Sequence, residues 1–329
     1  DKVYKAFKEE LAKKKIPFRL VKVGCFGFCA REPLVNIRLP HKPLVILQKV
    51  QLKDVKKIIK SISKGSIPFE KALCRIEEWD HLTDKVLYGR GFEEIPLYSE
   101  VPFFKWQKKI VLRNSGLINP EDIEEYIAVG GYLALFKALY EKSPQGIVDE
   151  VSASKLRGRG GAGFPTGIKW GLMTKANSDE KYIICNADEG DPGAYMNRNE
   201  IESDPHMLIE GMVIGAYAMS AQKGIVYMRA EYPLAVERLK RAIMQAKDYG
   251  ILGKKILGSD FEFDLEVVEG AGAFVCGEET ALMHSIEGKS GRPRPRPPFP
   301  AEKGLWEKPT NINNVETWCN ILVILHKGA

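Results

Sequence analysis

From Pro102 onward the sequence alternates between segments with helical periodicity and short apolar runs with the spacing of strands. Helices are predicted at 205–220, 233–247 and 278–287, and strands at 182–185, 224–229 and 263–268. Strands that alternate with helices are joined by crossovers, which favour a largely parallel sheet covered by helices. The alternation therefore predicts an α/β sandwich over residues 101–329.

A smaller unit, residues 1–64, precedes this region. Its patterns predict, in order, a helix, a strand, a loop with two cysteines, a hairpin and a second helix. The first helix is predicted at 3–14 and the strand at 18–23. The hairpin is predicted at 34–39 and 44–50, and the second helix at 52–62. Residues 65–100 are mixed in character and are interpreted as a linker.

The composition is that of an ordinary globular protein, with 44% hydrophobic residues, 28% charged residues and a net charge of +6. No apolar stretch predicts direct membrane insertion, and neither a signal peptide nor a nucleic-acid-binding motif is visible. Six cysteines without a dense framework indicate a reducing, cytoplasmic compartment rather than a disulfide scaffold. The modest positive charge leaves open a basic face for an acidic partner or an anionic cofactor.

The strongest local signal is the glycine-rich run Leu156–Trp170. It contains the pattern GxGxxG, at Gly158, Gly160 and Gly163. The residues before it, 146–155, predict a helix, whereas a dinucleotide-binding fingerprint follows a strand. Glycine backbone can still approach a phosphate closely at the start of the next helix. Three cations would support such an anion: Arg157, Arg159 and Lys169. A flexible surface loop is the alternative.

Four further segments combine glycine with polar or charged residues. They are Cys185–Gly193, Glu269–Thr280, Arg292–Pro300 and Thr310–Thr317. The first follows a predicted strand, where ligands of open α/β sheets bind, and its acids could accept hydrogen bonds from a heterocycle or ribose. By itself it could equally be an acidic turn. Likewise, Arg292–Pro300 could be a polyproline linker rather than a cationic wall with an aromatic platform.

Together and in this order, the five segments resemble the NADH-binding flavoprotein subunit of respiratory complex I and its soluble relatives. Those relatives include NAD(P)-linked and electron-bifurcating hydrogenases and NAD-dependent formate dehydrogenases. The resemblance implies a Rossmann-like FMN- and NADH-binding α/β sandwich, preceded by a partial thioredoxin-like ferredoxin domain. It also implies an NAD(P)H-dependent oxidoreductase that exchanges hydride between NAD(H) and FMN and passes electrons singly to iron–sulfur clusters.

The resemblance implies a cofactor-binding role for each matching position, and no catalytic side chain, because the hydride chemistry belongs to the cofactors. Around the FMN phosphate and ribityl chain it implies Gly158, Arg159, Gly160, Gly161, Gly163 and Lys169, closed by Asn313, Asn314 and Thr317. Bordering the isoalloxazine it implies Asn186, Asp188, Glu189, Phe274, Gly277 and Glu278. For NADH it implies Phe164 and Phe299 at the adenine and Glu279 and Asp191 at the riboses. Two dinucleotide positions depart from the family pattern: Leu172, where Phe is common, and Arg296, where Lys is common.

The N-terminal unit resembles the second half of a thioredoxin-like [2Fe–2S] ferredoxin domain, with Gly24–Pro33 as the matching segment. Cys25 and Cys29 would be its second cysteine pair, and such a cluster needs four thiolates. The chain begins at Asp1 without a Met, so a first pair is expected upstream if the gene product is longer; a degenerate cluster site is the alternative. The family also continues, beyond Ala329, into a region with four cysteines for a [4Fe–4S] cluster. The other cysteines are expected to be buried: Cys74, Cys185, Cys276 and Cys319.

The resemblance implies two kinds of partner: a thioredoxin-like [2Fe–2S] subunit and a larger iron–sulfur or catalytic subunit. The run Asp191–Arg198 and the fused N-terminal unit favour a soluble hydrogenase or bifurcating complex over respiratory complex I. Two other functions stay open from the sequence. One is a non-catalytic assembly subunit with a vestigial pocket, and the other is a binding module for a different nucleotide or a quinone.

Overall fold

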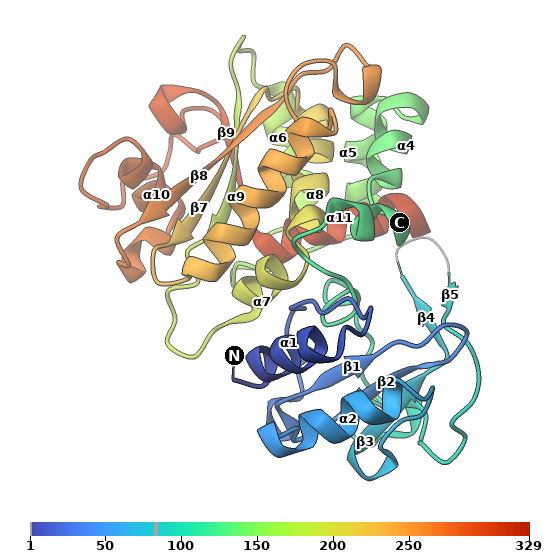
Figure 1. Ribbon diagram of the computed structural model, residues 1–329. Helices are drawn as coiled ribbons and strands as arrows, with labels where there is room; N and C mark the ends of the chain where they lie inside the picture. Colours follow the sequence, from blue (N-terminus) through green and yellow to red (C-terminus); the bar gives the residue numbers. More distant parts are fainter. Residues whose placement is uncertain (1, 82–84) are drawn as a thin grey trace. The chain divides into compact units, whose positions relative to one another are not determined.

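The computed structural model describes residues 2–81 and 85–329, which fold as two compact units (Figure 1). Unit 1 comprises Asp1–Lys109 and Arg113–Asn119, and unit 2 comprises Ile110–Leu112 and Pro120–Ala329. Residues 82–84, within the segment interpreted as a linker, lie outside the described residues.

Unit 1 is built on an antiparallel sheet in the order β1 (Val35–Ile37), β2 (Leu44–Leu47) and β3 (Ala72–Ile76). Helices α1 (Lys2–Lys14) and α2 (Val55–Ile62) share one apolar core with alternate residues of β1 and β2. Every residue of β2 is buried, because its other face packs against a second apolar core. The predicted hairpin and both predicted helices of this unit are confirmed.

Residues 65–100 are not a linker. They contribute β3, which pairs with β2, and a second hairpin of β4 (Glu78–Asp80) and β5 (Lys85–Leu87). The strands are short, and β4 and β5 expose most of their residues, so their sequence lacks the clear apolar alternation that predicts a strand. Residues 65–100 are therefore an integral part of unit 1.

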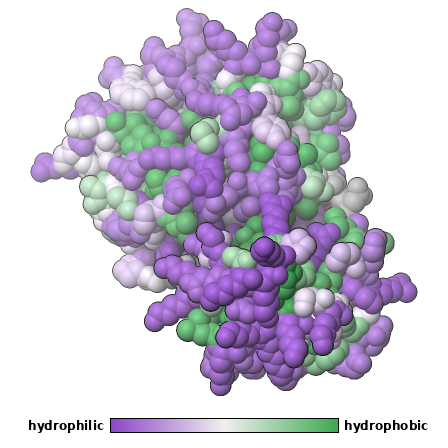
Figure 2. All heavy atoms as spheres, in the orientation of Figure 1, coloured by the Kyte–Doolittle hydropathy of each residue, from purple (hydrophilic) through white to green (hydrophobic). Residues whose placement is uncertain are grey.

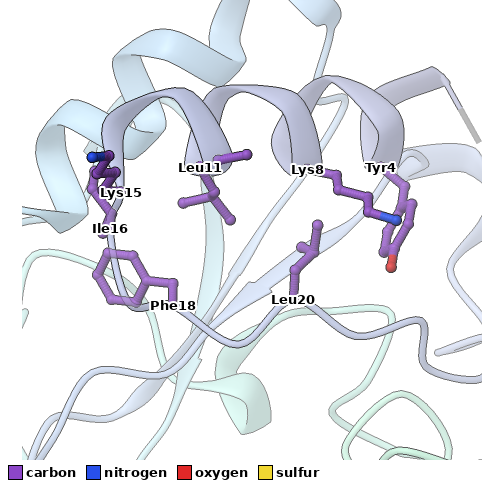
Figure 3. A pocket seen from close by; sticks show the side chains of 8 residues that line it. Tyr4, Lys8, Leu11, Lys15, Ile16, Phe18 and Leu20 are labelled. Atoms are coloured by element: carbon purple, nitrogen blue, oxygen red, sulfur yellow. The ribbon is translucent and has the colours of Figure 1, made fainter.

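Residues 18–23, predicted as a strand, carry no strand assignment. The apolar side chains that begin this segment instead face α1 across a cavity of about 370 Å³ (Figure 3). The cavity is lined by Tyr4, Lys8, Leu11, Ala12, Lys15, Ile16, Phe18 and Leu20. The predicted strand at 18–23 is therefore not confirmed, although its Phe18 and Leu20 side chains pack against the core that contains α1.

Unit 2 is built on a four-stranded sheet in the order β8 (Asp264–Gly270), β7 (Lys223–Arg229), β6 (Tyr182–Ala187) and β9 (Thr310–Asn314). All three pairings are parallel. The predicted α/β sandwich with a parallel sheet is therefore confirmed. The edge strand β9 was not predicted, because Thr and Asn dominate it and Asn is depleted in strands.

Helices cover both faces of this sheet. Helix α10 (Glu279–Ile286) lies on one side, and α8 (Pro205–Met219), α9 (Pro233–Asp248) and α11 (Val315–Lys327) lie on the other (Figure 1). The remaining helices are α3 (Ile123–Ala128), α4 (Leu133–Glu141), α5 (Pro144–Ala153), α6 (Thr166–Lys175) and α7 (Met196–Ser203). Helix α5 precedes the glycine-rich run, which confirms that the GxGxxG pattern follows a helix rather than a strand.

Helices α8 and α11 pack at very close range. A Cβ added at Gly215 of α8 would lie 2.3 Å from the Trp318 ring, and one at Gly211 would lie 2.2 Å from the Trp318 carbonyl oxygen. Trp318 is fully buried and also contacts Trp170 of α6 at 5.7 Å between ring centroids. The two glycines therefore set the distance between α8 and α11.

A buried carboxylate fixes the start of α4. Glu210 of α8 is fully buried and accepts hydrogen bonds from the Tyr126 hydroxyl and from the backbone N–H groups of Tyr132 and Leu135. Burial raises the pKa of Glu210, and these hydrogen bonds oppose the rise. This buried hydrogen-bond network joins α3 (Ile123–Ala128), α4 and α8.

None of the helices in the described ranges is long and apolar enough to cross a membrane. The face drawn in Figure 2 is mostly hydrophilic, with apolar side chains in scattered groups. Such scattered apolar exposure is normal for a globular protein.

Replacing Gly215 with Ala should lower the free energy of unfolding by about 2 kcal/mol, because the new methyl group overpacks the contact with Trp318. Gly171→Ala is the matched control. Gly171 is also helical, and apart from its chain neighbours and its own helix backbone no described atom lies within 4 Å of an added Cβ. That change should instead stabilise the protein by about 0.5–1 kcal/mol. Denaturant unfolding of both variants tests the pair, and equal effects would contradict the packing argument.

Candidate functional site

The carboxyl ends of all four parallel strands meet at one edge of the unit 2 sheet. Strand β6 leads into the acidic loop Asp188–Gly193, β7 ends at Arg229, and β9 ends at Asn314. The Arg229 guanidinium donates to the Glu189 carbonyl oxygen at 3.0 Å, which joins the first two of these ends. This edge is where open α/β sheets bind their ligands.

The glycine-rich run forms a closed loop beside this edge. The Gly158 N–H donates to the Phe164 carbonyl oxygen at 2.9 Å, which closes the loop. The Arg159 N–H donates to the Thr317 hydroxyl at 3.0 Å, which joins the loop to α11. Gly161 lies in the left-handed region, at φ +107°, and apart from its chain neighbours no described atom lies within 4 Å of an added Cβ there. The crest of the loop is thus open backbone that only glycine adopts easily.

Three charged side chains from three segments meet where α6 contacts β9 and α10. The Lys169 ammonium of α6 donates to the Ile312 carbonyl oxygen of β9 at 2.6 Å and to Glu279 Oε2 of α10 at 3.1 Å. Glu279 Oε1 in turn accepts from the Arg296 guanidinium at 2.5 Å. We call this set the Lys169–Glu279–Arg296 triad.

The segment Arg292–Pro300 is fastened along α10 rather than forming a free linker. The Arg292 carbonyl oxygen lies 2.7 Å from His284 Nδ1, and the Arg294 N–H donates to the Thr280 hydroxyl at 2.9 Å. Together with the ion pair between Arg296 and Glu279, these contacts hold the cationic segment against the site. Its aromatic residue, Phe299, remains 53% exposed.

The side-chain amide of Asn186 joins the acidic loop to the glycine-containing segment Glu269–Thr280. Asn186 Nδ2 donates to the Gly277 carbonyl oxygen at 2.8 Å, and Asn186 Oδ1 accepts from the Asp188 N–H at 3.1 Å. Burial raises the pKa of Asp188, while the nearby Arg229 opposes the rise. A Cβ at Gly190 would lie 2.7 Å from Asp188 Oδ2 and 3.1 Å from the Phe274 Cα, so a larger residue would displace these neighbours.

Two glutamates predicted to border the flavin ring also cap helices. Glu189 accepts from the N–H groups of Asn197 and Arg198 at the start of α7, at 2.8 and 3.0 Å. Glu278 accepts from the N–H groups of Thr280 and Ala281 at the start of α10, both at 2.9 Å. Burial acts to raise the pKa of Glu278, but its hydrogen bonds outweigh burial and the pKa is lowered. Both carboxylates are therefore held in place at helix N-termini.

The other predicted residues divide into two groups. Thr317 and Asn313 are buried, and the Asn313 side chain hydrogen-bonds that of Asn311 within β9 at 2.8 Å. Leu172 and three aromatic residues are instead largely exposed, at 49% for Phe164, 70% for Phe274 and 53% for Phe299. Asp191 is exposed in the acidic loop. The structure therefore places Asn313 among packed side chains and leaves the aromatic rings on the surface.

The hydrogen-bond partner of Asn314 at this edge, Asn197, is not among the residues that the sequence predicts. Asn314 Nδ2 donates to Asn197 Oδ1 at 2.6 Å, and Asn314 Oδ1 accepts from the Glu316 N–H at 3.0 Å. Asn197 also donates to the buried Glu200, whose pKa is raised strongly by burial. The one available signal was the helix-capping position of Asn314, since Asn is a favoured N-cap.

Unit 1 carries a separate candidate metal site. The ligand atoms of Cys25, Cys29 and Glu32 all lie within 4.8 Å of one another. The Gly27 N–H donates to Cys25 Sγ at 3.3 Å, as suits a thiolate ligand. The other four cysteines are buried, which confirms the expectation for them.

The residues at the sheet edge fit a phosphorylated cofactor in their chemistry. The crest of the glycine loop leaves room for close backbone approach. Arg159 of the loop and Lys169 of α6 are candidate phosphate ligands, paired here with Glu316 at 3.5 Å and with Glu279 at 3.1 Å. Asp188 and Asn186 offer hydrogen-bond acceptors and donors of the kind that a heterocycle needs. Fold and site together define an α/β protein built to bind nucleotide-type cofactors.

The chain belongs to the family described as the Nuo51 FMN-binding domain, which matches residues 151–323, over half of the chain. The matched region contains the glycine loop, the acidic loop, the triad and Asn314.

Similar proteins include subunits of two kinds of oxidoreductase. The chain is 58% identical over 225 residues to HndC, a subunit of the NADP-reducing hydrogenase of Solidesulfovibrio fructosivorans, covering 68% of this chain and 46% of that protein. It is 49% identical over 240 residues to a subunit of the NADH-quinone oxidoreductase of Aquifex aeolicus, covering 73% and 55%. The chain thus spans about half the length of these curated relatives.

The fold also matches a solved structure. A chain of an NAD+-reducing [NiFe]-hydrogenase in the H2-reduced state superposes with a TM-score of 0.56 and 30% sequence identity. The match covers 87% of this chain and 43% of that one. This agreement confirms the α/β fold and the predicted family.

Proposed function

We propose that this chain is the NADH- and FMN-binding module of a multisubunit oxidoreductase, and that it exchanges hydride between NAD(H) and FMN. The observation that carries the proposal is the convergence of the glycine loop, Lys169 and the acidic loop at the carboxyl edge of the sheet. Membership of an FMN-binding family and likeness to NADH- and NADP-linked relatives support it. A cytoplasmic location and partner subunits are part of the proposal.

In this function the protein binds and orients, and bound FMN supplies the hydride chemistry. Lys169, Arg159 and the crest of the glycine loop would hold the flavin phosphate. Asn186 and Asp188 would face the ring. The carboxylates of Glu189 and Glu278, which cap α7 and α10, would lie near the ring. Because these hydrogen bonds already hold them, they need not move when the cofactor binds.

The dinucleotide would lie against the exposed rings of Phe164 and Phe299, with Glu279 and Asp191 at its riboses. Exposed aromatic faces suit an adenine, because stacking needs an open face on each ring. The similarity to HndC favours a hydrogenase-type parent complex over respiratory complex I. A thioredoxin-like [2Fe–2S] subunit and a larger iron–sulfur subunit are the proposed partners.

Cys25 and Cys29 are proposed as one half of a [2Fe–2S] site, with two further thiolates from upstream residues of the gene product. Their proximity and the N–H group directed at Cys25 support this role. A [4Fe–4S] cluster beyond Ala329 stays a prediction.

Lys169→Ala should weaken FMN binding by about 10- to 150-fold, because a charge-assisted hydrogen bond contributes about 1.5–3 kcal/mol. Flavin content and FMN titration by fluorescence measure the effect. Lys175→Ala is the control, since Lys175 lies exposed in the last turn of the same helix. Full flavin content in the Lys169 variant would rule out its phosphate role, and a colourless wild-type protein would favour an assembly subunit without flavin.

NADH should reduce the flavin more effectively than NADPH, by about tenfold, which corresponds to about 1.4 kcal/mol. The carboxylates of Glu279 and Asp191 suit a ribose 2′-hydroxyl and repel a 2′-phosphate. Arg296 would attract a 2′-phosphate and so favour NADPH, but its ion pair with Glu279 weakens that attraction. Rapid-mixing measurements with both nucleotides test this. Glu279→Gln should reduce the preference for NADH over NADPH. Glu269→Gln, which alters an exposed ion pair with Lys240, should leave that preference unchanged.

In the full-length gene product, Cys25→Ser should remove iron equivalent to one [2Fe–2S] cluster, because the cluster loses a thiolate ligand. Iron and sulfide analysis, with the visible spectrum, reports the loss. Cys74→Ala serves as the control, since this buried cysteine belongs to the apolar core of the same unit. Unchanged iron content after Cys25→Ser would show that the pair holds no cluster.

A further inference from the structure

Glu279 is shared between two cations that serve different parts of the proposed site. Its Oε2 accepts from Lys169 at 3.1 Å, and its Oε1 accepts from Arg296. The side chains of Glu279 and Lys169 are only 20% and 28% exposed, and that of Arg296 is 42% exposed. Partial burial reduces solvent screening, so each charge acts on the other two.

The two cations differ in how firmly they are held. Lys169 extends from α6 and has a second acceptor, the Ile312 carbonyl oxygen of β9. Arg296 extends from the irregular Arg292–Pro300 segment, and a second acidic neighbour in the described chain is Glu278 Oε1 at 3.9 Å. Arg296 is also the most exposed member of the triad, so it is the one that an anion arriving from solvent reaches first.

We propose that the triad couples the two cofactor sites, so that dinucleotide binding weakens FMN binding through Glu279. The proposal rests on the function above, in which Lys169 faces the flavin phosphate and Arg296 faces the dinucleotide. While Arg296 neutralises Glu279, the ammonium of Lys169 keeps its attraction for a phosphate. When Arg296 turns to the dinucleotide, the full charge of Glu279 acts on Lys169 and that attraction falls.

Because such coupling is reciprocal, FMN must weaken dinucleotide binding by the same factor. The effect requires only a change in the partner of Arg296, with no movement of the sheet or the helices. Glu279 acts here as a positioning residue, because its carboxylate changes how strongly Lys169 attracts a phosphate.

The experiment measures the FMN Kd of the full chain after removal of flavin, by quenching of FMN fluorescence, with and without saturating NAD+. NAD+ is used because it cannot reduce the flavin, so the readout is independent of turnover. We expect NAD+ to raise the FMN Kd about fivefold, at the low end of typical couplings because the triad is partly exposed.

Glu279→Gln separates charge coupling from a merely structural role. Coupling predicts that this variant binds FMN more tightly than the wild type and no longer responds to NAD+. A structural role predicts looser FMN binding with the NAD+ effect retained. Arg296→Ala should also abolish the NAD+ effect, at NAD+ concentrations shown to saturate that variant.

Arg292→Ala is the matched control, because it removes the same charge from the same segment. The hydrogen bond that joins Arg292 to α10 uses only its backbone. This variant should keep the fivefold response. A response that persists in Glu279→Gln, or is lost equally in Arg292→Ala, would overturn the coupling. A wild-type chain that binds FMN but ignores NAD+ would overturn the coupling alone, and one that takes up no FMN would overturn the proposed function as well.

Discussion

The site depends on the parallel pairing of β6 between β7 and β9. Parallel strands end at the same edge, so the acidic loop, Arg229 and Asn314 come together although they are far apart in the sequence. The crossover helices that parallel pairing requires then bury both faces of the sheet. An antiparallel neighbour would have moved one of these polar ends to the opposite edge.

Helix starts provide the second level of organisation. Glu189 and Glu278 use their carboxylates to cap α7 and α10, and Asn314 caps α11. Each cap satisfies backbone N–H groups and at the same time fixes a polar loop at the sheet edge. The same hydrogen bonds therefore begin the helices and hold the polar loops of the site in place.

The elements with strong periodicity were predictable from sequence, and the long-range contacts were not. Helices α8 and α9 and strands β6 and β7 follow clear apolar patterns. Strand β9 does not, since Thr and Asn make up most of it and Asn is depleted in strands.

The candidate site shows the same division. Its glycine and acidic segments could be recognised individually, and the resemblance gave their roles. The ion pair of Lys169 with Glu279 joins residues 110 positions apart, so no local pattern contains it. The capping role of Glu278 was similarly hidden, because Ser, Thr, Asp and Asn are the usual signals at that position.

The position of Trp170 next to Lys169 has a consequence for how flavin would be lost. Trp170 is fully buried against Trp318, so α6 cannot rotate about its axis without opening the core between α6, α8 and α11. The helix that carries Lys169 is therefore held in place by the hydrophobic interior, in addition to the polar partners of the ammonium group. Flavin retention during heating should accordingly follow the melting of this core, as one cooperative event rather than an earlier release from the surface.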